Sequence, residues 1–344
     1  MRIPSPQEIR GQFPPSKEDL AFVLEAREQA EQILRRKTGR LALLVGPCSI
    51  HDPDLALEYA ERLKRLSGEI ENFFLVMRVF LEKPRTRMGW KGMVYDPHLN
   101  GSNDIAAGLK IARKLLLEMA QQKIPTATEL LEPLVVPYFE DLITWGLIGA
   151  RTSASQPHRQ MASGLPFPVG FKNDIHGELD VAICGILSAR MSHSFLHIDD
   201  GGQLNALETA GNPYTHLVLR GSETKTNFDP HSVAVGLSAL LNNQLEPCIF
   251  VDCSHGNSGK DHRRQSIAFE SVIQQSLDGN EAIAGLMLES HLVAGKQGIG
   301  DKGSLNYGVS ITDSCMGWEE TESLIRWADD KLSFRSMSMS SVQK

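Results

Sequence analysis

The chain has 344 residues, a formal net charge of −7, 41% hydrophobic residues and five cysteines, so it is long enough for one large α/β domain with additions. The acidic balance argues against a nucleic acid or an anionic membrane surface as the main partner, and no apolar run approaches the roughly 20 residues of a membrane span. Residues 1–20 lack the apolar segment of a secretory signal and no CxxC pair occurs, so we expect a cytoplasmic protein.

Residues 1–40 are predicted to form an N-terminal arm with one helix. Ser16 followed by Asp19 has the spacing of a capping pair at a helix start. Apolar residues then recur with helical spacing until Gly39, which ends the pattern.

From residue 41 on, short apolar runs alternate with polar or Gly-rich turns and helical stretches, which is typical of parallel β/α units. The nine runs cover 41–46, 73–79, 125–129, 147–151, 168–172, 194–199, 216–220, 248–252 and 283–289. The segment after 194–199 leaves little room for a crossover helix, because a Gly-Gly turn and an Asn-Pro stop follow closely.

Residues 194–209 are therefore predicted to be an inserted β-hairpin. The other eight runs predict a (β/α)8 barrel over 41–331, which is an α/β fold of the TIM-barrel type. The Ser/Met-rich residues 332–344 are expected to form a disordered tail.

A polar side chain follows the end of each predicted barrel strand, where the strands of such a barrel converge on one mouth. These side chains are Cys48, Arg78, Glu129, Arg151, Lys172, Arg220, His255 and Glu289. Any one of them alone is more simply explained as a helix cap or a salt-bridge partner. Together they predict a binding site, because four cations at one mouth are costly unless a multiply charged anion occupies it.

The four cations Arg78, Arg151, Lys172 and Arg220 come from four different strands and lack the order of a Walker loop. Arginine binds phosphate and carboxylate bidentately and lysine acts as a point charge. A compact ligand with both groups, such as phosphoenolpyruvate, suits this set. Lys83, Arg85 and Thr86 begin a long loop that predicts a second phosphate site, although a solvated basic turn is the simpler alternative.

Cys48, His255, Glu289 and Asp313 resemble metal ligands. Their spacing is not that of a zinc finger and no HExxH motif is present. A thiolate, an imidazole and carboxylates accommodate Mn²⁺, Fe²⁺, Co²⁺ or Zn²⁺, so the residues alone do not select the metal. Taken singly, Cys48 also fits a buried apolar position.

Several long segments resemble the type I family of 3-deoxy-D-arabino-heptulosonate 7-phosphate (DAHP) synthases over roughly residues 40–330. They read VGPCSIHD, MRVFLEKPRT, GWKG, TATELL, IGARTSASQ, PVGFKN, LVLRG, VDCSHGNSGK, ESHLVAG and SITDSCMGWE. The resemblance implies an enzyme that condenses phosphoenolpyruvate with erythrose 4-phosphate and releases phosphate, the first step of the shikimate pathway.

The resemblance also implies roles for individual residues. One divalent ion, with Mn²⁺ favoured over Fe²⁺, Co²⁺ and Zn²⁺, is bound by Cys48, His255, Glu289 and Asp313. Phosphoenolpyruvate is bound by Arg78, Arg151, Lys172 and Arg220, with Glu129 acting through water. Erythrose 4-phosphate is bound by Lys83, Arg85 and Thr86. Lys83, as proton donor, and His255 are the expected catalytic residues.

Regulated members of this family bind an aromatic amino acid beside the barrel and commonly have serine at the positions of Pro166 and His197. Loss of these two hydroxyl groups predicts altered or absent inhibition by phenylalanine and tyrosine. Family members also use an N-terminal arm to join subunits, so residues 1–40 predict a homodimer or a homotetramer.

Three alternatives remain open at this point. The sister synthase that uses arabinose 5-phosphate shares the barrel and the cations, but the KPRT segment and the chain length argue against it. A metal-free barrel with a regulatory role predicts a broken ligand set, whereas the set is complete here. A metal-dependent aldolase is the third alternative. It would not need the set of cations that suits an additional phosphate and carboxylate, so it ranks below the sister synthase.

Overall fold

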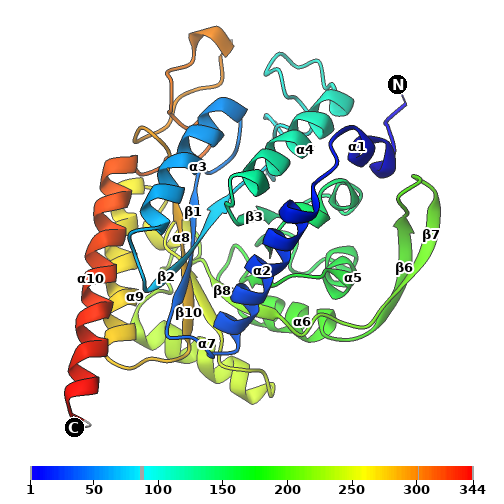
Figure 1. Ribbon diagram of the computed structural model, residues 1–344. Helices are drawn as coiled ribbons and strands as arrows, with labels where there is room; N and C mark the ends of the chain where they lie inside the picture. Colours follow the sequence, from blue (N-terminus) through cyan, green and yellow to red (C-terminus); the bar gives the residue numbers. More distant parts are fainter. Residues whose placement is uncertain (1, 86–88, 301, 343–344) are drawn as a thin grey trace.

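Eight parallel strands close into a barrel in the order β1-β10-β9-β8-β5-β4-β3-β2 in the computed structural model, which describes residues 2–85, 89–300 and 302–342 (Figure 1). The barrel strands are β1 Leu41–Gly46, β2 Phe73–Arg78, β3 Thr126–Glu129, β4 Trp145–Ile148, β5 Val169–Lys172, β8 Thr215–Leu219, β9 Ile249–Asp252 and β10 Ile283–Glu289. The predicted (β/α)8 barrel is confirmed. The most displaced strand is β4, which lies two to three residues before the predicted run.

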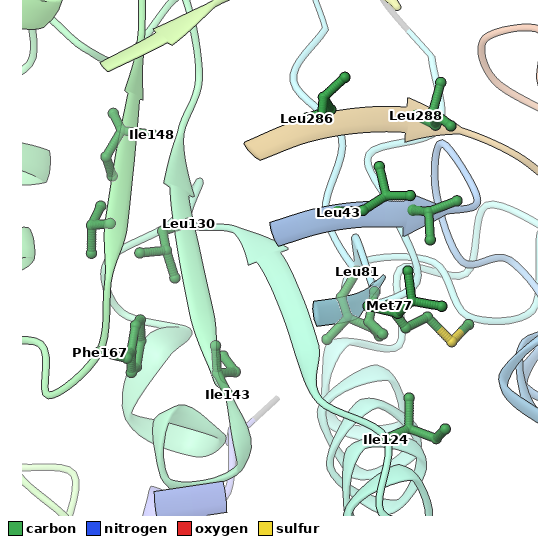
Figure 2. Close-up of a cluster of buried hydrophobic side chains, with 14 of the residues drawn as sticks. Leu43, Met77, Leu81, Ile124, Leu130, Ile143, Ile148, Phe167, Leu286 and Leu288 are labelled. Carbon is green, nitrogen blue, oxygen red and sulfur yellow. The ribbon is translucent and has the colours of Figure 1, made fainter. Parts of the chain in front are cut away.

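Both faces of the barrel strands are apolar, because the inward face fills the barrel and the outward face packs against helices. In β1, Leu43 belongs to the outer cluster, whereas Ala42 and Leu44 belong to the inner one. Figure 2 shows part of the outer cluster, with Leu43 beside Leu286 of β10, its partner in the parallel register. This alternation fixes the register, since a one-residue slip would exchange the two faces.

Helices follow most of the barrel strands. They are α3 Pro53–Ser67, α4 Ile105–Gln121, α5 Gln156–Gly164, α6 Asp180–Ala189, α7 Pro230–Asn242, α8 His255–Ser258, α9 Gln265–Leu277 and α10 Trp318–Val342. The connection from β3 to β4 contains two short 3₁₀ turns, Val136–Tyr138 and Glu140–Leu142, in place of an α-helix. Among the described residues no helix combines the length and the apolar character that crossing a membrane requires.

The N-terminal arm contains two helices, α1 Pro6–Gln12 and α2 Lys17–Leu34, where the sequence predicted one. The predicted capping pair at the start of α2 is present, but α1 starts with a capping box of its own at Ser5. In α2, Ala30 and Ile33 pack in the same cluster as Ala42 and Phe74, which lie near the starts of their strands. The helix therefore closes the amino end of the barrel.

Strands β6 His193–Ile198 and β7 Leu204–Thr209 form an antiparallel hairpin that stands out from the barrel near α5 (Figure 1). This is the inserted hairpin that the sequence predicted. Its turn contacts the arm, because Gln7 N donates a 2.8 Å hydrogen bond to Asp200 O and Arg10 pairs with the Asp200 carboxylate at 3.2 Å.

The chain stays helical beyond residue 331, where the sequence predicted a disordered tail. Helix α10 continues to Val342. The Asn72 amide donates 2.7 Å to the Ser333 hydroxyl, and the backbone of Asn72 donates 2.7 Å to Asp329. These contacts tie the middle of α10 to the loop before β2, so the helix is not ended by the polar composition of the segment.

Candidate metal and anion site at the barrel mouth

A cavity of about 330 Å³, here called the mouth cavity, opens at the carboxyl ends of the barrel strands. It is lined by Lys83, Pro84, Arg85, Glu129, Gly149, Ala150, Arg151, Lys172, Arg220, His255, Lys260 and Asp313. The predicted site residues that do not line it are Cys48, Arg78 and Glu289, which are buried next to it, and Thr86, which lies outside the described residues. The structure therefore brings sequence-distant candidates together in one place.

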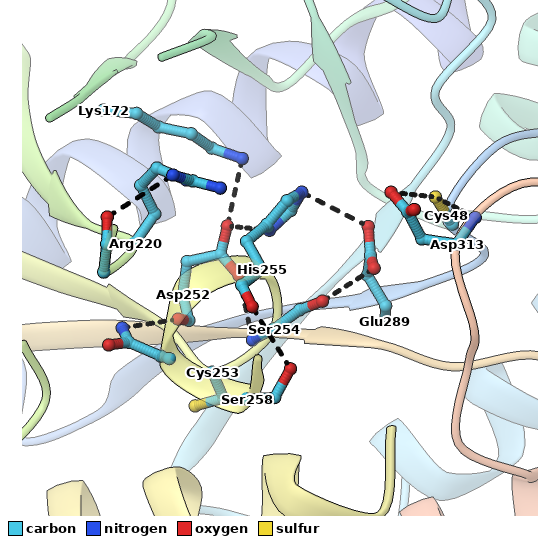
Figure 3. A network of polar contacts seen from close by, with 12 residues as sticks. Cys48, Lys172, Arg220, Asp252, Cys253, Ser254, His255, Ser258, Glu289 and Asp313 are labelled. Carbon is cyan, nitrogen blue, oxygen red and sulfur yellow. Dashed lines mark hydrogen bonds and ion pairs between the residues drawn. The ribbon is translucent and has the colours of Figure 1, made fainter. Parts of the chain in front are cut away.

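Three predicted metal ligands converge beside this cavity. Donor atoms of Cys48, Glu289 and Asp313 all lie within 4.8 Å of one another, and the Cys48 thiol is 3.7 Å from Asp313 Oδ2 (Figure 3). One thiol and two carboxylates, gathered where Cys48 and Glu289 are almost fully buried, form a donor set that fits a divalent transition metal.

His255 lies at the edge of this trio. Its Nε2 is 3.6 Å from Glu289 Oε1, and its Nδ1 is 2.8 Å from Asp252 Oδ2. A carboxylate behind an imidazole is the arrangement that orients metal-binding histidines. His255 has a backbone φ of +52°, a strained conformation for a non-glycine residue that costs about 1–3 kcal/mol and is often found at functional sites.

The Lys83 ammonium contacts the same group of donors. Its Nζ donates 2.9 Å to the Cys48 thiol and lies 4.0 Å from Asp313 Oδ2. Burial raises the pKa of Cys48 to about 12, the Glu289 charge adds to this rise, and Lys83 opposes it. Burial lowers the pKa of Lys83, but the Cys48 sulfur and the carboxylates of Glu289 and Asp313 outweigh burial and raise it above its ordinary value. Lys83 is therefore held protonated at the mouth.

The Arg78 guanidinium is fully buried and pairs with Glu289 at 3.0 Å. It also stacks on the Phe80 ring, with 4.0 Å between the guanidinium carbon and the ring centroid. Its Nη1 has no hydrogen-bond partner among the described residues. This nitrogen is a buried donor that a bound anion can satisfy.

Among the described residues that line the mouth cavity, cations outnumber carboxylates. Lys172 pairs with Asp252 at 3.0 Å, and His255 and Lys172 lower the pKa of that aspartate well below its ordinary range against the effect of burial. Burial lowers the pKa of Arg220, Asp252 opposes the fall, and the neighbouring charge of Arg151 adds to it. An anion bound between the two arginines relieves their repulsion.

Arg151 reaches the mouth from a turn and not from the end of a strand, because β4 ends at Ile148. Gly149 begins this turn, and a Cβ there would lie 2.4 Å from Glu129 Oε1. A side chain at this position would therefore displace the Glu129 carboxylate from its place beside the turn.

Sequence reasoning missed Asp252 and Lys260. Asp252 is the last residue of β9, and its position at a strand end was the signal that identified the other candidates. Lys260 lies in the loop that carries His255 and borders the mouth cavity. No strand ends at Lys260, so the sequence offered no comparable signal for it.

A second cavity, of about 400 Å³, lies between the hairpin and the barrel and is here called the hairpin cavity. Its lining is mostly apolar and includes Phe195, Leu196, His197, Leu207 and Met161. His197 is thus placed at this cavity, whereas Pro166 does not line it and follows Leu165, which does.

Comparison with known proteins places the chain among biosynthetic aldolases. The DAHP synthetase I family matches residues 22–326. The Tyr-sensitive phospho-2-dehydro-3-deoxyheptonate aldolase of Escherichia coli (strain K12) is 47% identical over 324 residues, which are 94% of this chain and 91% of that protein. The Trp-sensitive enzyme of the same organism is 45% identical over 322 residues, which are 93% of this chain and 92% of that protein.

A solved structure supports the same relationship. The phospho-2-dehydro-3-deoxyheptonate aldolase from Francisella tularensis SCHU S4 is similar with a TM-score of 0.95 and 38% sequence identity. The match covers 97% of this chain and 98% of that one. The similarity therefore includes the arm and the hairpin as well as the barrel.

Proposed function

This chain belongs to the DAHP synthetase I family, and from that premise we propose that it condenses phosphoenolpyruvate with erythrose 4-phosphate to give DAHP and inorganic phosphate. It is a DAHP synthase, an enzyme of the first step of the shikimate pathway. The two substrates, the metal and the role of each residue are the parts that we propose.

The observation that carries the proposal is that a group of metal-binding side chains lies next to an anion-binding cavity. The thiol and carboxylate trio of Cys48, Glu289 and Asp313 adjoins a cavity rich in cations, and Asp313 belongs to both. Metal chemistry and anion binding therefore take place within one mouth, as a reaction between two phosphorylated substrates requires.

Phosphoenolpyruvate suits the deeper part of the mouth. Arg151 and Arg220 both line the cavity there, and a phosphate dianion would accept hydrogen bonds from both guanidinium groups. Lys172 adds a point charge, and Arg78 Nη1 offers the buried donor that is without a partner among the described residues. Glu129 borders the same cavity and is proposed to act through a bound water.

Erythrose 4-phosphate is assigned to the loop after β2. Lys83 and Arg85 both line the mouth cavity, and Arg85 Nε donates 2.7 Å to the Trp90 carbonyl, which holds its guanidinium in place. A phosphate at this loop would keep the substrate within the mouth cavity, which Asp313 also lines.

The residues fit one divalent metal ion, which Cys48, His255, Glu289 and Asp313 would hold. When bound, such an ion supplies Lewis-acid activation of the aldehyde. The Asp252 carboxylate lies 2.8 Å from His255 Nδ1, and Nε2 lies on the side of Glu289. Mn²⁺, Fe²⁺, Co²⁺ and Zn²⁺ all suit these donors, and we propose Mn²⁺.

Lys83 is the proposed proton donor. Its Nζ carries a proton because the surrounding Cys48, Glu289 and Asp313 raise its pKa against the effect of burial. It lies at the junction of the trio and the mouth cavity. A proton on Nζ can therefore move to the oxygen on which negative charge develops as the new carbon–carbon bond forms.

The assay that tests this function measures phosphate release by metal-stripped protein to which single metals are returned. We expect release only when phosphoenolpyruvate, erythrose 4-phosphate and a divalent metal are all present. Arabinose 5-phosphate replaces erythrose 4-phosphate in a parallel assay. Equal or faster release with the five-carbon aldose, or full activity after metal removal, would overturn the proposal.

A further inference from the structure

Glu82 is a buried carboxylic acid in the loop that we assign to erythrose 4-phosphate, directly before Lys83. It is 4% exposed. Burial raises its pKa to about 8, hydrogen bonds from the Glu132 backbone and the Tyr95 hydroxyl oppose the rise, and the Glu132 charge adds to it. Near neutral pH the carboxyl is therefore mostly protonated and acts as an uncharged hydrogen-bonding group.

Two parts of this loop lie against each other. We call residues 79–85 the outgoing segment and residues 89–96 the return segment. Lys83 N in the outgoing segment donates a 2.9 Å hydrogen bond to Lys91 O in the return segment. The backbone position of the proposed proton donor therefore depends on where the return segment lies.

Gly92 allows the two segments to approach so closely. Its backbone φ is +112°, and a Cβ there would lie 2.4 Å from the Leu81 carbonyl oxygen and 2.6 Å from Glu82 Cα. A side chain would force the return segment away from the outgoing one. The pairing is thus built into the backbone at the residue where Glu82 begins.

The Glu82 side chain joins three pieces of chain. The Tyr95 hydroxyl, in the return segment, donates 3.1 Å to Glu82 Oε1. The backbone of Glu132, in the loop that follows β3, donates 3.4 Å to Glu82 Oε2. We call this arrangement the Glu82 clasp. It ties the outgoing segment both to the return segment and to the body of the barrel.

The clasp and the site hold neighbouring residues of the outgoing segment. Lys83 Nζ contacts the Cys48 thiol at 2.9 Å, and Arg85 Nε is bound to the Trp90 carbonyl of the return segment. Both cations therefore depend on the placement of a few backbone atoms next to Glu82. A shift of about 1 Å in such a group can cost about a hundredfold in rate.

We propose that Glu82 is a positioning residue for the aldose: through Tyr95 and the Glu132 backbone it holds the outgoing segment so that Lys83 and Arg85 meet erythrose 4-phosphate. Glu82 is not among the described residues that line the mouth cavity, so it acts through its neighbours. The inference rests on the proposed function, because that function identifies the substrate.

The experiment measures phosphate release at saturating Mn²⁺ while each substrate is varied in turn. Glu82→Ala is expected to raise the KM for erythrose 4-phosphate about tenfold, as the loss of a supporting hydrogen bond does, and to leave the KM for phosphoenolpyruvate unchanged. A role in stability alone would lower the amount of active protein and change neither KM. An equal rise in both KM values would overturn the proposal.

Glu82→Gln is the conservative variant. Its amide is uncharged, has nearly the same size and can still accept a hydrogen bond from Tyr95 or from the Glu132 backbone. We expect it to restore the wild-type KM for erythrose 4-phosphate. A Glu82→Gln protein as impaired as Glu82→Ala would contradict the clasp. Glu118→Ala, on the surface of α4, should keep wild-type kinetics.

Tyr95→Phe tests the clasp from its other side and removes only a hydroxyl group. It is expected to raise the KM for erythrose 4-phosphate about threefold, because one hydrogen bond of the clasp is lost. Tyr138→Phe is the matched control, since its hydroxyl is bonded to the Pro4 carbonyl at the N-terminal arm, and should keep the wild-type KM. An unchanged KM in Tyr95→Phe would overturn the proposal.

A double-mutant cycle shows whether Glu82 acts through its neighbour. In an Arg85→Gln background, Glu82→Ala should raise the KM for erythrose 4-phosphate by clearly less than it does in the wild-type protein, because one of the groups that it positions is absent. A full further increase would show that the two residues act independently and would contradict the proposal.

The two proposals fail in different ways. If the wild-type protein releases no phosphate from phosphoenolpyruvate and erythrose 4-phosphate, the proposed function is wrong and the role of Glu82 falls with it. If the wild-type protein is active and Glu82→Ala has the wild-type KM for both substrates, the positioning role is wrong and the proposed function stands.

Discussion

The hydroxyl groups of Ser49 and Thr312 are hydrogen-bonded at 2.7 Å although 263 residues separate them in the chain. Ser49 follows Cys48, and Thr312 precedes Asp313. The bond therefore joins the backbone of two proposed metal ligands that come from opposite ends of the barrel sequence. The bond therefore helps to hold the Cys48 thiol near the Asp313 carboxylate, two groups that are far apart in the sequence.

Ser49→Ala is expected to weaken Mn²⁺ binding about tenfold, because loss of a supporting hydrogen bond next to the ligands lets them separate. The measurement is the Mn²⁺ dissociation constant from calorimetry on stripped protein. Ser67→Ala, which removes a surface hydroxyl bound to the Lys64 carbonyl, serves as the control. Unchanged Mn²⁺ affinity in Ser49→Ala would show that the bond does not position the ligands.

Arg78→Met is expected to lower the free energy of unfolding by about 3–5 kcal/mol, because it leaves the buried Glu289 carboxylate without its cation. Urea denaturation of the metal-free protein measures the change. Lys114→Met is the matched control, since Lys114 pairs with Glu118 on the surface of α4, and such pairs contribute about 0.5 kcal/mol or less. Equal losses in the two variants would contradict the prediction.

Lys83→Met is expected to lower kcat about 10²–10⁴-fold, the range typical of a lost proton donor. The exposed Lys64→Met should keep the wild-type rate. Near-normal turnover of Lys83→Met would remove Lys83 from the catalytic role. If Lys83→Met lowers the affinity for Mn²⁺ but leaves kcat unchanged at saturating Mn²⁺, the role of Lys83 is to position the Cys48 thiol and not to donate a proton.

His216 makes stability depend on pH in a defined direction. Its ring lies inside the barrel, 4.6 Å from the Phe250 ring and 5.3 Å from the Trp145 ring, and burial lowers its pKa to about 3. The unfolded chain binds a proton near pH 6.5, but the folded protein does not. Stability from this group is therefore complete above pH 6.5 and is lost as the pH falls toward 3.

His216→Phe should remove this dependence. Relative to the variant, the wild-type protein is expected to lose about 1.4 kcal/mol of unfolding free energy per pH unit between pH 6 and 4. Urea denaturation across that range measures the difference. His231→Phe, at an exposed position of α7, controls for the loss of one imidazole. Parallel pH profiles of His216→Phe and wild type would refute the assignment.

Phenylalanine and tyrosine at sub-millimolar concentration are expected to leave the rate of this enzyme unchanged or weakly affected. His197 lines the mostly apolar hairpin cavity, and the family resemblance implies serine at this position in regulated members, so the hydroxyl at position 197 is replaced by an imidazole. Initial rates with each amino acid test this. Strong inhibition by either one would prove the prediction wrong, and His197→Ser is expected to increase sensitivity.

The barrel could be predicted from the sequence because its strands are buried on both faces and therefore read as apolar runs. The site could be predicted because polar residues that end such runs meet at one mouth. The same logic gave the hairpin, since a Gly-Gly turn left no room for a crossover helix. Apolar runs, polar residues at their ends and turn residues are local patterns, and the β/α units repeat them along the chain.

The features that the sequence analysis missed have more than one cause. Helix α1 is short and was not predicted, although Ser5 and Glu8 form a capping box that is a local signal. Helix α10 extends past the predicted end, and the Asn72 side chain binds Ser333 just beyond that point. Asp252 contacts His255, three residues further along the chain, and its position at the end of a strand was a signal that the sequence analysis did not use.

Closure of the barrel has a consequence for how the polypeptide is made. Strand β1 pairs with β2 on one side and with β10 on the other. During synthesis, the edge of β1 that faces β10 stays unpaired until more than two hundred further residues have left the ribosome. An unpaired apolar edge of that kind invites pairing with other nascent chains. We expect newly made protein to need chaperone protection until β10, the last strand of the barrel, has paired with β1.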